Sequence, residues 1–250
     1  MRLRNKTALV TGSSSGIGAG VAVAFAQEGA TVVINYPEES DASIAKTVLK
    51  AIETSKGKAS TFQADVSKED EVEALVKHTL DECGQIDILV NNAGIAHTAP
   101  VETIPVETWD RLLAVHLRGT FLMTRRVLPH MYERNTGTII NTSSQLAYKG
   151  SPGLTHYTAA KGAIISFTRS LALEIGDRNI NANCVAPGAT ITPMLDAVPE
   201  EHIETIRQSI PKGRLAEVDD IIGTYVFLAS DDASHYVGQV LSPNGGDVFL

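Results

Sequence analysis

Short apolar runs, many of them rich in β-branched residues, alternate along this chain with longer stretches of helical periodicity. Buried strands are expected at five of these runs: 8–10, 31–34, 86–90, 138–141 and 180–185. Helices are expected between them, from about residue 17, from about residue 41, and over 68–82, 106–134 and 155–175. The alternation predicts βαβ units, and hence an α/β fold with a doubly wound parallel sheet covered by helices on both faces. Ligands of such sheets bind beyond the carboxyl ends of the strands, so residues that directly follow a strand are candidates for function.

The 250-residue length and the 43% hydrophobic content suffice for one large core, and we expect a single domain over 1–250. The segment of about 189–213 departs from the rest in composition, because Pro193, Pro199 and Pro211 interrupt its short apolar pieces. We interpret this segment as a lid over the substrate.

Charge and cysteine content argue against several classes of function. The 21 basic and 29 acidic residues give a net charge of −8, which disfavours nucleic acid or an anionic membrane as a partner. Cys83 and Cys184 lie far apart and outside any Cys-x-x-Cys or Cys/His pattern, so neither a disulfide framework nor a metal site is expected. The first residues carry no signal segment and no run is long enough to span a membrane, so we expect a cytoplasmic protein with a small-molecule substrate.

A glycine-rich turn directly follows the first expected strand and opens the first expected helix. Backbone N–H groups of such a turn, together with the helix N-terminus, can hold a pyrophosphate. The spacing is G-x-x-x-G-x-G, and a turn of this kind taken alone is equally compatible with a structural role. The residues expected to hold a dinucleotide here are Gly12, Ser14, Ser15, Gly16, Ile17 and Gly18.

The choice between NAD and NADP is usually made at the end of the second strand, where a carboxylate binds the ribose 2′-OH or a basic residue binds a 2′-phosphate. Here that stretch reads Asn-Tyr-Pro-Glu-Glu over 35–39 and contains no basic residue. Glu38 and Glu39 would repel a phosphate if they face it, although solvated surface positions are an equally good interpretation. The sequence therefore favours NAD over NADP.

Tyr157 and Lys161 lie four residues apart in an expected helix, so the phenol and the ammonium share one face. A phenol with its ordinary pKa of about 10 is a poor base at neutral pH, and an adjacent cation lowers that pKa towards a range that suits acid–base catalysis. Ser144 comes at the carboxyl end of an expected strand, where its hydroxyl could bind a substrate carbonyl. A Tyr-x-x-x-Lys pair alone is more often a surface pair or a core tyrosine, so its interpretation depends on the full set of motifs.

With Asn91-Asn92-Ala93-Gly94 after a further strand, these motifs resemble the short-chain dehydrogenase/reductase family in their order and spacing, from end to end of the chain. The Ala186-Pro187-Gly188 turn and the tail over 238–246 are also similar to that family. The resemblance implies a Rossmann fold with a mostly seven-stranded parallel sheet, a homotetramer, and hydride transfer between NAD(P) and a secondary alcohol, a ketone or a sugar hydroxyl.

The resemblance also implies a role for individual residues. Tyr157 would donate or accept the proton, Ser144 would polarise the carbonyl, and Lys161 would lower the pKa of the tyrosine and bind the nicotinamide ribose. Asp65 and Asn92 would contact the adenine and the ribose, although turn and cap roles suit them equally well. The further cofactor contacts that it implies are Val66, Ala93, Gly94, Tyr157, Lys161, Pro187, Gly188, Thr190 and Thr192.

Two positions depart from the family pattern. His116 stands where the family usually has an asparagine, which holds a water in a proton relay to the lysine. A histidine also donates or accepts a hydrogen bond, so it could keep the relay, add a titrating group, or be a packing substitution in a slower enzyme; we expect it to be catalytic. Tyr36, which we expect to contact the cofactor, stands where NAD-preferring members often have aspartate. Sugar dehydrogenases with a similar Asn-Tyr pair continue with arginine, where this chain has Pro37.

The substrate stays open at this point. Many relatives reduce 3-oxoacyl groups on an acidic carrier protein, but they tend to have arginines where this chain has Asn135 and Leu173. A 3-oxoacyl-[acyl-carrier-protein] reductase is therefore the alternative enzyme, beside sugar dehydrogenases and reductases of small, partly apolar ketones. An alternative of another class is a regulatory protein that binds the dinucleotide without turnover, which the intact set of Ser144, Tyr157 and Lys161 disfavours.

Overall fold

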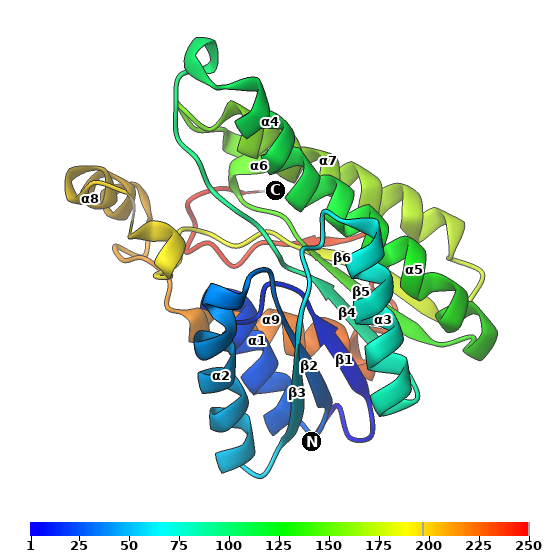
Figure 1. Ribbon diagram of the computed structural model, residues 1–250. Helices are drawn as coiled ribbons and strands as arrows, with labels where there is room; N and C mark the ends of the chain where they lie inside the picture. The colour runs from blue at the N-terminus through cyan, green and yellow to red at the C-terminus, as the bar shows by residue number, and fades with distance from the viewer. Residues whose placement is uncertain (197, 250) are drawn as a thin grey trace.

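A seven-stranded sheet forms the centre of the computed structural model, which describes residues 1–196 and 198–249. Ala197, inside the expected lid, and Leu250, at the end of the expected domain, lie outside the described residues. All neighbouring strands pair in parallel, in the order β3-β2-β1-β4-β5-β6-β7 (Figure 1). The strands are β1 Thr7–Val10, β2 Thr31–Tyr36, β3 Lys58–Gln63, β4 Ile88–Asn91, β5 Gly137–Thr142, β6 Ile180–Val185 and β7 Val240–Leu241. The predicted doubly wound parallel sheet is confirmed.

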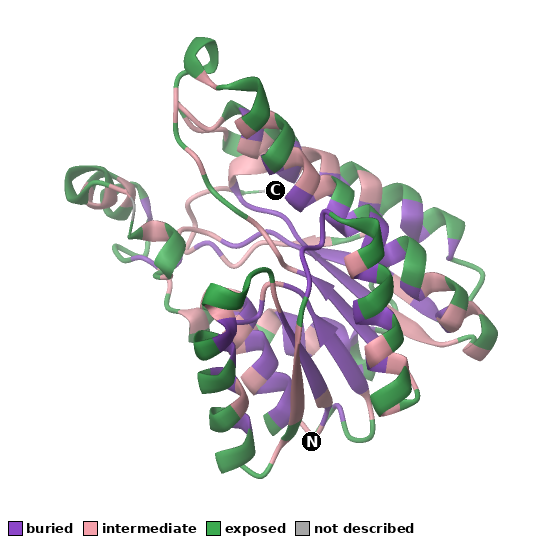
Figure 2. Cartoon of the chain, in the orientation of Figure 1, coloured by how far each residue is buried: buried purple, intermediate pink, exposed green. Residues whose placement is uncertain are grey.

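Helices cover both faces of this sheet, and Figure 2 shows buried residues concentrated in the strands between them. One face packs on α1 Gly16–Gln27, α2 Ala42–Thr54 and α9 Val218–Ala229. The other face packs on α3 Glu69–Cys83, α5 Gly119–Arg134 and α7 Thr155–Glu174. Within β1, Ala8 and Val10 join the first core while Leu9 joins the second. Both faces are covered, so β1, β2 and β4 are nearly continuous apolar runs rather than alternating ones.

The strand order places β1 between β2 and β4, so the chain winds outward from β1 in both directions. A crevice forms at such a reversal point, outside the carboxyl ends of the two central strands. The glycine turn follows β1 and the Asn92 turn follows β4, so the fold brings these two motifs to the same crevice.

The two sheet edges, β3 and β7, are not predicted by the alternation of apolar runs. Strand β3 reads Lys-Ala-Ser-Thr-Phe-Gln and its side chains are partly or fully exposed. An edge strand has one neighbour, so it needs less apolar surface than a central strand. Strand β7 has only two residues, too few for a pattern.

The stretch predicted as one helix over 106–134 is helical throughout but changes its winding. It comprises α4 Val106–Leu113, a π-helical turn Ala114–Arg118, and α5 Gly119–Arg134. A π-helical turn inserts an extra residue into a helix and occurs frequently at functional sites. His116 is the middle residue of this turn.

The segment expected to be a lid contains the 3-10 helix Pro193–Leu195 and α8 Glu200–Ser209. A parallel bridge between Thr190 and Ala216 joins its two ends. The remaining helices are the short α6 Leu146–Lys149 and three 3-10 turns, Glu39–Asp41, Val101–Thr103 and Asp231–Ala233. Within the described residues, no helix is both long and apolar enough to cross a membrane.

Candidate active site

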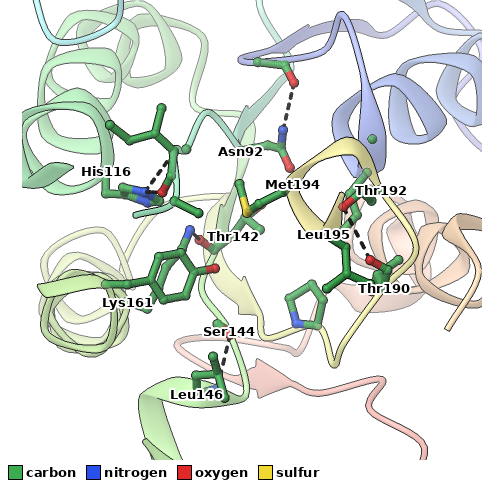
Figure 3. A pocket seen from close by; sticks show the side chains of 18 of the residues that line it. Asn92, His116, Thr142, Ser144, Leu146, Lys161, Thr190, Thr192, Met194 and Leu195 are labelled. Atoms are coloured by element: carbon green, nitrogen blue, oxygen red, sulfur yellow. Dashed lines mark hydrogen bonds between the residues drawn. The ribbon is translucent and has the colours of Figure 1, made fainter. Parts of the chain in front are cut away.

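A cavity of about 710 Å³ lies beyond the carboxyl ends of the strands, since residues that follow β1, β2, β4, β5 and β6 line it. Gly18 and Tyr36 are expected site residues that do not belong to its wall. The other expected residues do line it: Gly12, Ser14, Ser15, Gly16, Ile17, Asp65, Val66, Asn92, Ala93, Gly94, His116, Ser144, Tyr157, Lys161, Pro187, Gly188, Thr190 and Thr192. Figure 3 shows His116, Lys161 and Ser144 on one side of it and Thr190 and Thr192 opposite.

The glycine turn has the shape that a close approach of backbones requires. Gly12 has a positive φ of 58°, and a Cβ there would lie 2.7 Å from Ala93 Cα. A Cβ on Gly18 would lie 2.4 Å from the Gly12 carbonyl oxygen, so only a residue without a side chain fits at position 18 against this turn. Helix α1 begins at Gly16, and Gly16 and Ile17 of its first turn line the cavity; the N-terminus of a helix has unpaired backbone N–H groups that can hold phosphate.

Two asparagines clamp this turn. Asn92 Nδ2 donates to the carbonyl oxygens of Thr11 (3.0 Å) and Gly12 (3.1 Å). Asn35 Oδ1 accepts from the Gly12 N–H (3.1 Å), while its Nδ2 donates to Ala64 O (2.9 Å). The role of Asn35 was missed from the sequence, although a buried polar residue within an otherwise apolar strand is a usable signal for such a brace.

The wall beyond the end of β2 is acidic. Pro37, Glu38 and Asp41 line the cavity there, whereas Tyr36 packs against the apolar core behind it. The expectation that Tyr36 contacts the cofactor therefore finds no support in the cavity wall, because the alternation of the strand turns this side chain away.

Asp65 lies next to this region and pairs with Arg111, with 2.8 Å between Oδ2 and Nη1. The Ser67 N–H (3.0 Å) and hydroxyl (2.8 Å) donate to the same carboxylate. Although burial raises it, these hydrogen bonds and the Arg111 guanidinium hold the pKa of Asp65 below its usual value. Arg111 is thus already engaged by a carboxylate and by the Ser67 hydroxyl (2.7 Å).

Lys161 and Tyr157 meet on the first turns of α7. Lys161 Nζ donates to the backbone carbonyl of Thr142 at 2.8 Å, drawn as a dashed line in Figure 3. The same ammonium lies 5.6 Å from the centre of the Tyr157 ring. Ser144, two residues after Thr142, is buried, and its hydroxyl accepts from the Leu146 N–H (3.1 Å). A carbonyl oxygen placed in this part of the cavity would have both a serine and a tyrosine hydroxyl beside it.

Burial governs the ionisation of both α7 groups. It lowers the pKa of Lys161 to about 8 and raises the pKa of the Tyr157 phenol, an effect that the Ser144 hydroxyl partly offsets. The expectation that Lys161 lowers the pKa of Tyr157 is therefore not met by the protein alone. The reason is that the ammonium points to the Thr142 carbonyl while the phenol loses most of its contact with water.

The support behind Thr142 was also missed from the sequence. The hydroxyl of Tyr225, on α9, lies 2.8 Å from Thr142 Oγ1 and is fully buried. The Ser143 hydroxyl donates to the Lys161 carbonyl (2.8 Å). Strand β5 is thus held on one side by α9 and on the other by α7, at the point where the lysine is anchored.

His116 is buried beside this pair, with its ring 5.5 Å from that of Tyr157 in an edge-to-face arrangement. Its Nε2 lies 2.8 Å from Ile95 O and 3.0 Å from Ile95 N, so one tautomer donates and the other accepts there. Among the described residues, none pairs with its buried Nδ1. A Cβ on Gly94 would lie 2.6 Å from His116 Cε1, so Gly94 makes room for this ring.

Burial lowers the pKa of His116 to about 3, and the nearby Lys161 charge acts in the same direction. The imidazole is therefore neutral near pH 7. Of the three roles expected from the sequence, this disfavours the titrating group and leaves a neutral hydrogen-bonding residue or a packing substitution.

Comparisons with known proteins agree with this geometry. A family model described as Enoyl-(Acyl carrier protein) reductase matches residues 12–247. The 3-oxoacyl-[acyl-carrier-protein] reductase FabG of Thermotoga maritima is 38% identical, over 98% of this chain and 99% of its own. The (2S)-[(R)-hydroxy(phenyl)methyl]succinyl-CoA dehydrogenase subunit BbsD of Thauera aromatica is 41% identical over 98% of both chains.

A solved structure from Beutenbergia cavernae, which contains NADP at low occupancy, superimposes with a TM-score of 0.92 at 34% identity. The match covers 98% of this chain and 97% of that one. Sequence, fold and cavity lead to the same assignment: the chain belongs to the short-chain dehydrogenase/reductase family.

Proposed function

We propose that this NAD(P)-dependent oxidoreductase interconverts a secondary alcohol and a ketone, with Tyr157 as the residue that transfers the proton. The observation that carries the proposal is the presence of Ser144, Tyr157 and Lys161 in one cavity with the glycine turn. Bound NAD(P) supplies or accepts the hydride at its nicotinamide. The alternative of a regulatory protein without turnover gains no support, since none of the three groups is lost.

In this mechanism the side chains bind, orient and exchange a proton. The Ser144 hydroxyl donates to the substrate carbonyl oxygen and polarises it, and the Tyr157 hydroxyl gives a proton to the same oxygen during reduction. Lys161, which donates to the Thr142 carbonyl, would also hold the nicotinamide ribose, and its positive charge would then act on Tyr157. His116 is neutral and lies edge-on against the Tyr157 ring. We assign it the role of a neutral hydrogen-bonding residue beside the tyrosine.

For the cofactor we propose a preference for NAD over NADP. Glu38 and Asp41 line the cavity beyond β2, where a 2′-phosphate would lie, and both would repel it. The basic residue nearest in the wall, Arg111, is already paired with Asp65. This makes the region better suited to a ribose hydroxyl than to a phosphate.

For the substrate, two candidates deserve comparison. The apolar wall provided by Leu146, Met194, Leu195 and Val198 suits a small, partly apolar ketone or a sugar-derived alcohol. A 3-oxoacyl-[acyl-carrier-protein] reductase is the second candidate, favoured by the name of the Thermotoga maritima relative. Leu173, where such enzymes tend to have arginine, is 85% exposed and gives an acidic carrier protein no charge to bind.

We extend the proposal to the assembly. One domain over 1–250 with a lid at about 189–213 would form a cytoplasmic homotetramer. Exposed apolar side chains on the outer faces of α5 and α7, Phe121 and Leu173, are candidates for the subunit contacts. Size-exclusion chromatography with light scattering measures the mass of the assembly.

The experiment that tests the function is a screen at 340 nm with NADH and NADPH against ketones, 3-oxoesters, hydroxy acids, diols and sugars. Replacing Tyr157 by Phe removes the proton donor, and we expect kcat to fall by about 10³-fold or more. Tyr236→Phe is the matched control, because this tyrosine is on the surface and its ring packs edge-to-face with Phe227. Tight NADH binding without turnover of any compound by the wild-type chain would refute the proposal.

A further inference from the structure

A second charged pair, Lys149 and Asp247, lines the cavity beyond Ser144 and has no role in the mechanism above. Lys149 is the last residue of α6, and its Nζ lies 2.7 Å from Oδ1 and 2.6 Å from Oδ2 of Asp247. The Asp247 side chain is 3% exposed, whereas that of Lys149 is 33% exposed. The ammonium is thus the accessible member of the pair and the carboxylate the buried one.

The Asp247 carboxylate is fully used by its surroundings. Besides the two contacts with Lys149, Oδ2 accepts from Gln145 Nε2 (2.6 Å) and Oδ1 accepts from the Ser209 hydroxyl (3.3 Å). These groups come from three segments: α6 with its N-cap, the end of α8, and the tail after β7. A substrate in the cavity therefore has no free oxygen of Asp247 to bind. The Asp247 carboxylate acts on the substrate only through its negative charge.

The ammonium of Lys149 is only partly used. It has three N–H donors, and Asp247 occupies two directions, which leaves one N–H for another acceptor. Among the residues that the structure describes, the other basic side chains in the wall are Lys161, held by Thr142, and Arg111, held by Asp65. Lys149 is therefore a second cation of the wall, beside Lys161, and Asp247 cancels its charge.

A carboxylate on the substrate would gain little here. The wall of the same cavity includes Leu146, Leu195, Val198 and Ile206, and an anion that leaves water for such a wall incurs a desolvation penalty that a free cation could offset. Because Asp247 already neutralises Lys149, that offset is small. An uncharged oxygen, such as an ester, hydroxyl or amide oxygen, needs only the one remaining N–H.

We infer that the Lys149–Asp247 pair sets substrate specificity: the carboxylate cancels the charge of the ammonium, and the pair so selects uncharged carbonyl compounds with a second oxygen over the corresponding carboxylates. This inference rests on the proposed function. A purely structural role is the competing explanation, in which Asp247 only pins the tail against α6 and α8. The specificity role and the structural role predict different changes in the ratio of kcat/KM between a neutral and an anionic substrate.

The test compares a 3-oxoester with the carboxylate of the same chain, beginning with methyl acetoacetate and acetoacetate. The wild-type enzyme should have the higher kcat/KM for the ester. Asp247→Asn leaves Lys149 unpaired, so the ester-to-acid ratio of kcat/KM should fall at least tenfold, a change of about 1.4 kcal/mol. The double variant Lys149→Met with Asp247→Asn removes both charges, and its ratio should return to within about threefold of the wild-type value.

Asp81→Asn is the matched control, since it removes the same charge from a pair with Lys77 on the exposed face of α3. Its ratio should equal that of the wild type. If Asp247→Asn and the double variant lower both activities in parallel, with the ratio unchanged, the pair is structural and the inference fails. Turnover of other ketones but of no 3-oxoester by the wild type also overturns it, whereas no turnover with either cofactor overturns the proposed function instead.

Discussion

His116 should make the stability of this protein depend on pH in a way that can be measured directly. Burial places the pKa of its imidazole at about 3, against about 6.5 for an exposed histidine in the unfolded chain. Well above pH 6.5 the imidazole is neutral in both the folded and the unfolded state, so the difference in pKa has no effect on stability. As the pH falls below 6.5, the unfolded chain takes up a proton that the folded protein refuses, so stability decreases until about pH 3.

The magnitude follows from the same two values. Each pH unit well inside this window costs about 1.36 kcal/mol, and integration from pH 7 to pH 5 gives a loss of about 2 kcal/mol from this one residue. The assay is urea unfolding at pH 7, 6 and 5 for the wild type and for His116→Asn. All other titrating groups, including the partly buried His130 and the buried His156, are common to both proteins and cancel in the difference.

We expect the wild type to lose about 2 kcal/mol more than His116→Asn between pH 7 and pH 5. Two unfolding curves that shift in parallel, within about 0.5 kcal/mol, would show that the folded protein protonates His116 near its ordinary pKa. The conclusion that His116 is a neutral, buried imidazole would then be wrong, and a titrating role for His116 in the proton relay would regain support.

Two further predictions concern the lysine anchor and the cofactor. Tyr225→Phe removes the hydroxyl that holds Thr142, at a cost of about 1 kcal/mol in unfolding free energy. Because the Thr142 carbonyl anchors Lys161, kcat should fall several-fold while KM stays unchanged, and the upper limb of the pH–kcat profile should move. A loss of stability with an unchanged pH–kcat profile would mean that Tyr225 is only a core residue. For the cofactor, kcat/KM should be higher with NADH than with NADPH, and Glu38→Arg should move the ratio towards NADPH by about tenfold or more, since one repulsive charge becomes attractive. A wild-type enzyme with a tenfold preference for NADPH would contradict the acidic lining beyond β2.

The alternation of apolar runs was sufficient to predict the central strands and the parallel sheet, because strands buried on both faces carry a strong and continuous signal. It was insufficient at the edges, where β3 is polar and β7 has two residues. The motifs that follow strands predicted the part of the cavity wall formed by the glycine turn, Asn92, Ser144 and Pro187, since the fold brings the carboxyl ends of all parallel strands to one side.

Contacts between distant segments could not be predicted in this way. Asn35 braces the glycine turn across 23 residues, and Tyr225 reaches Thr142 across 83. Asp247 reaches Lys149 from the tail. The burial that raises the pKa of Tyr157 in the protein alone was missed for a related reason: sequence spacing shows that a lysine is near, but not that its ammonium lies on a carbonyl and that the phenol is buried.

The π-helical turn at 114–118 has a consequence for how this chain can change. One extra residue in that turn changes the direction in which the side chains of α4 point relative to those of α5. Leu122, Val127 and Met131 of α5 must face the sheet. The side chain at 116 therefore lies against the Tyr157 ring while the apolar side of α5 stays on the core. A replacement of His116 by asparagine would leave this winding in place and change only the buried contacts of the ring, which are those with Tyr157, Ile95 and Gly94.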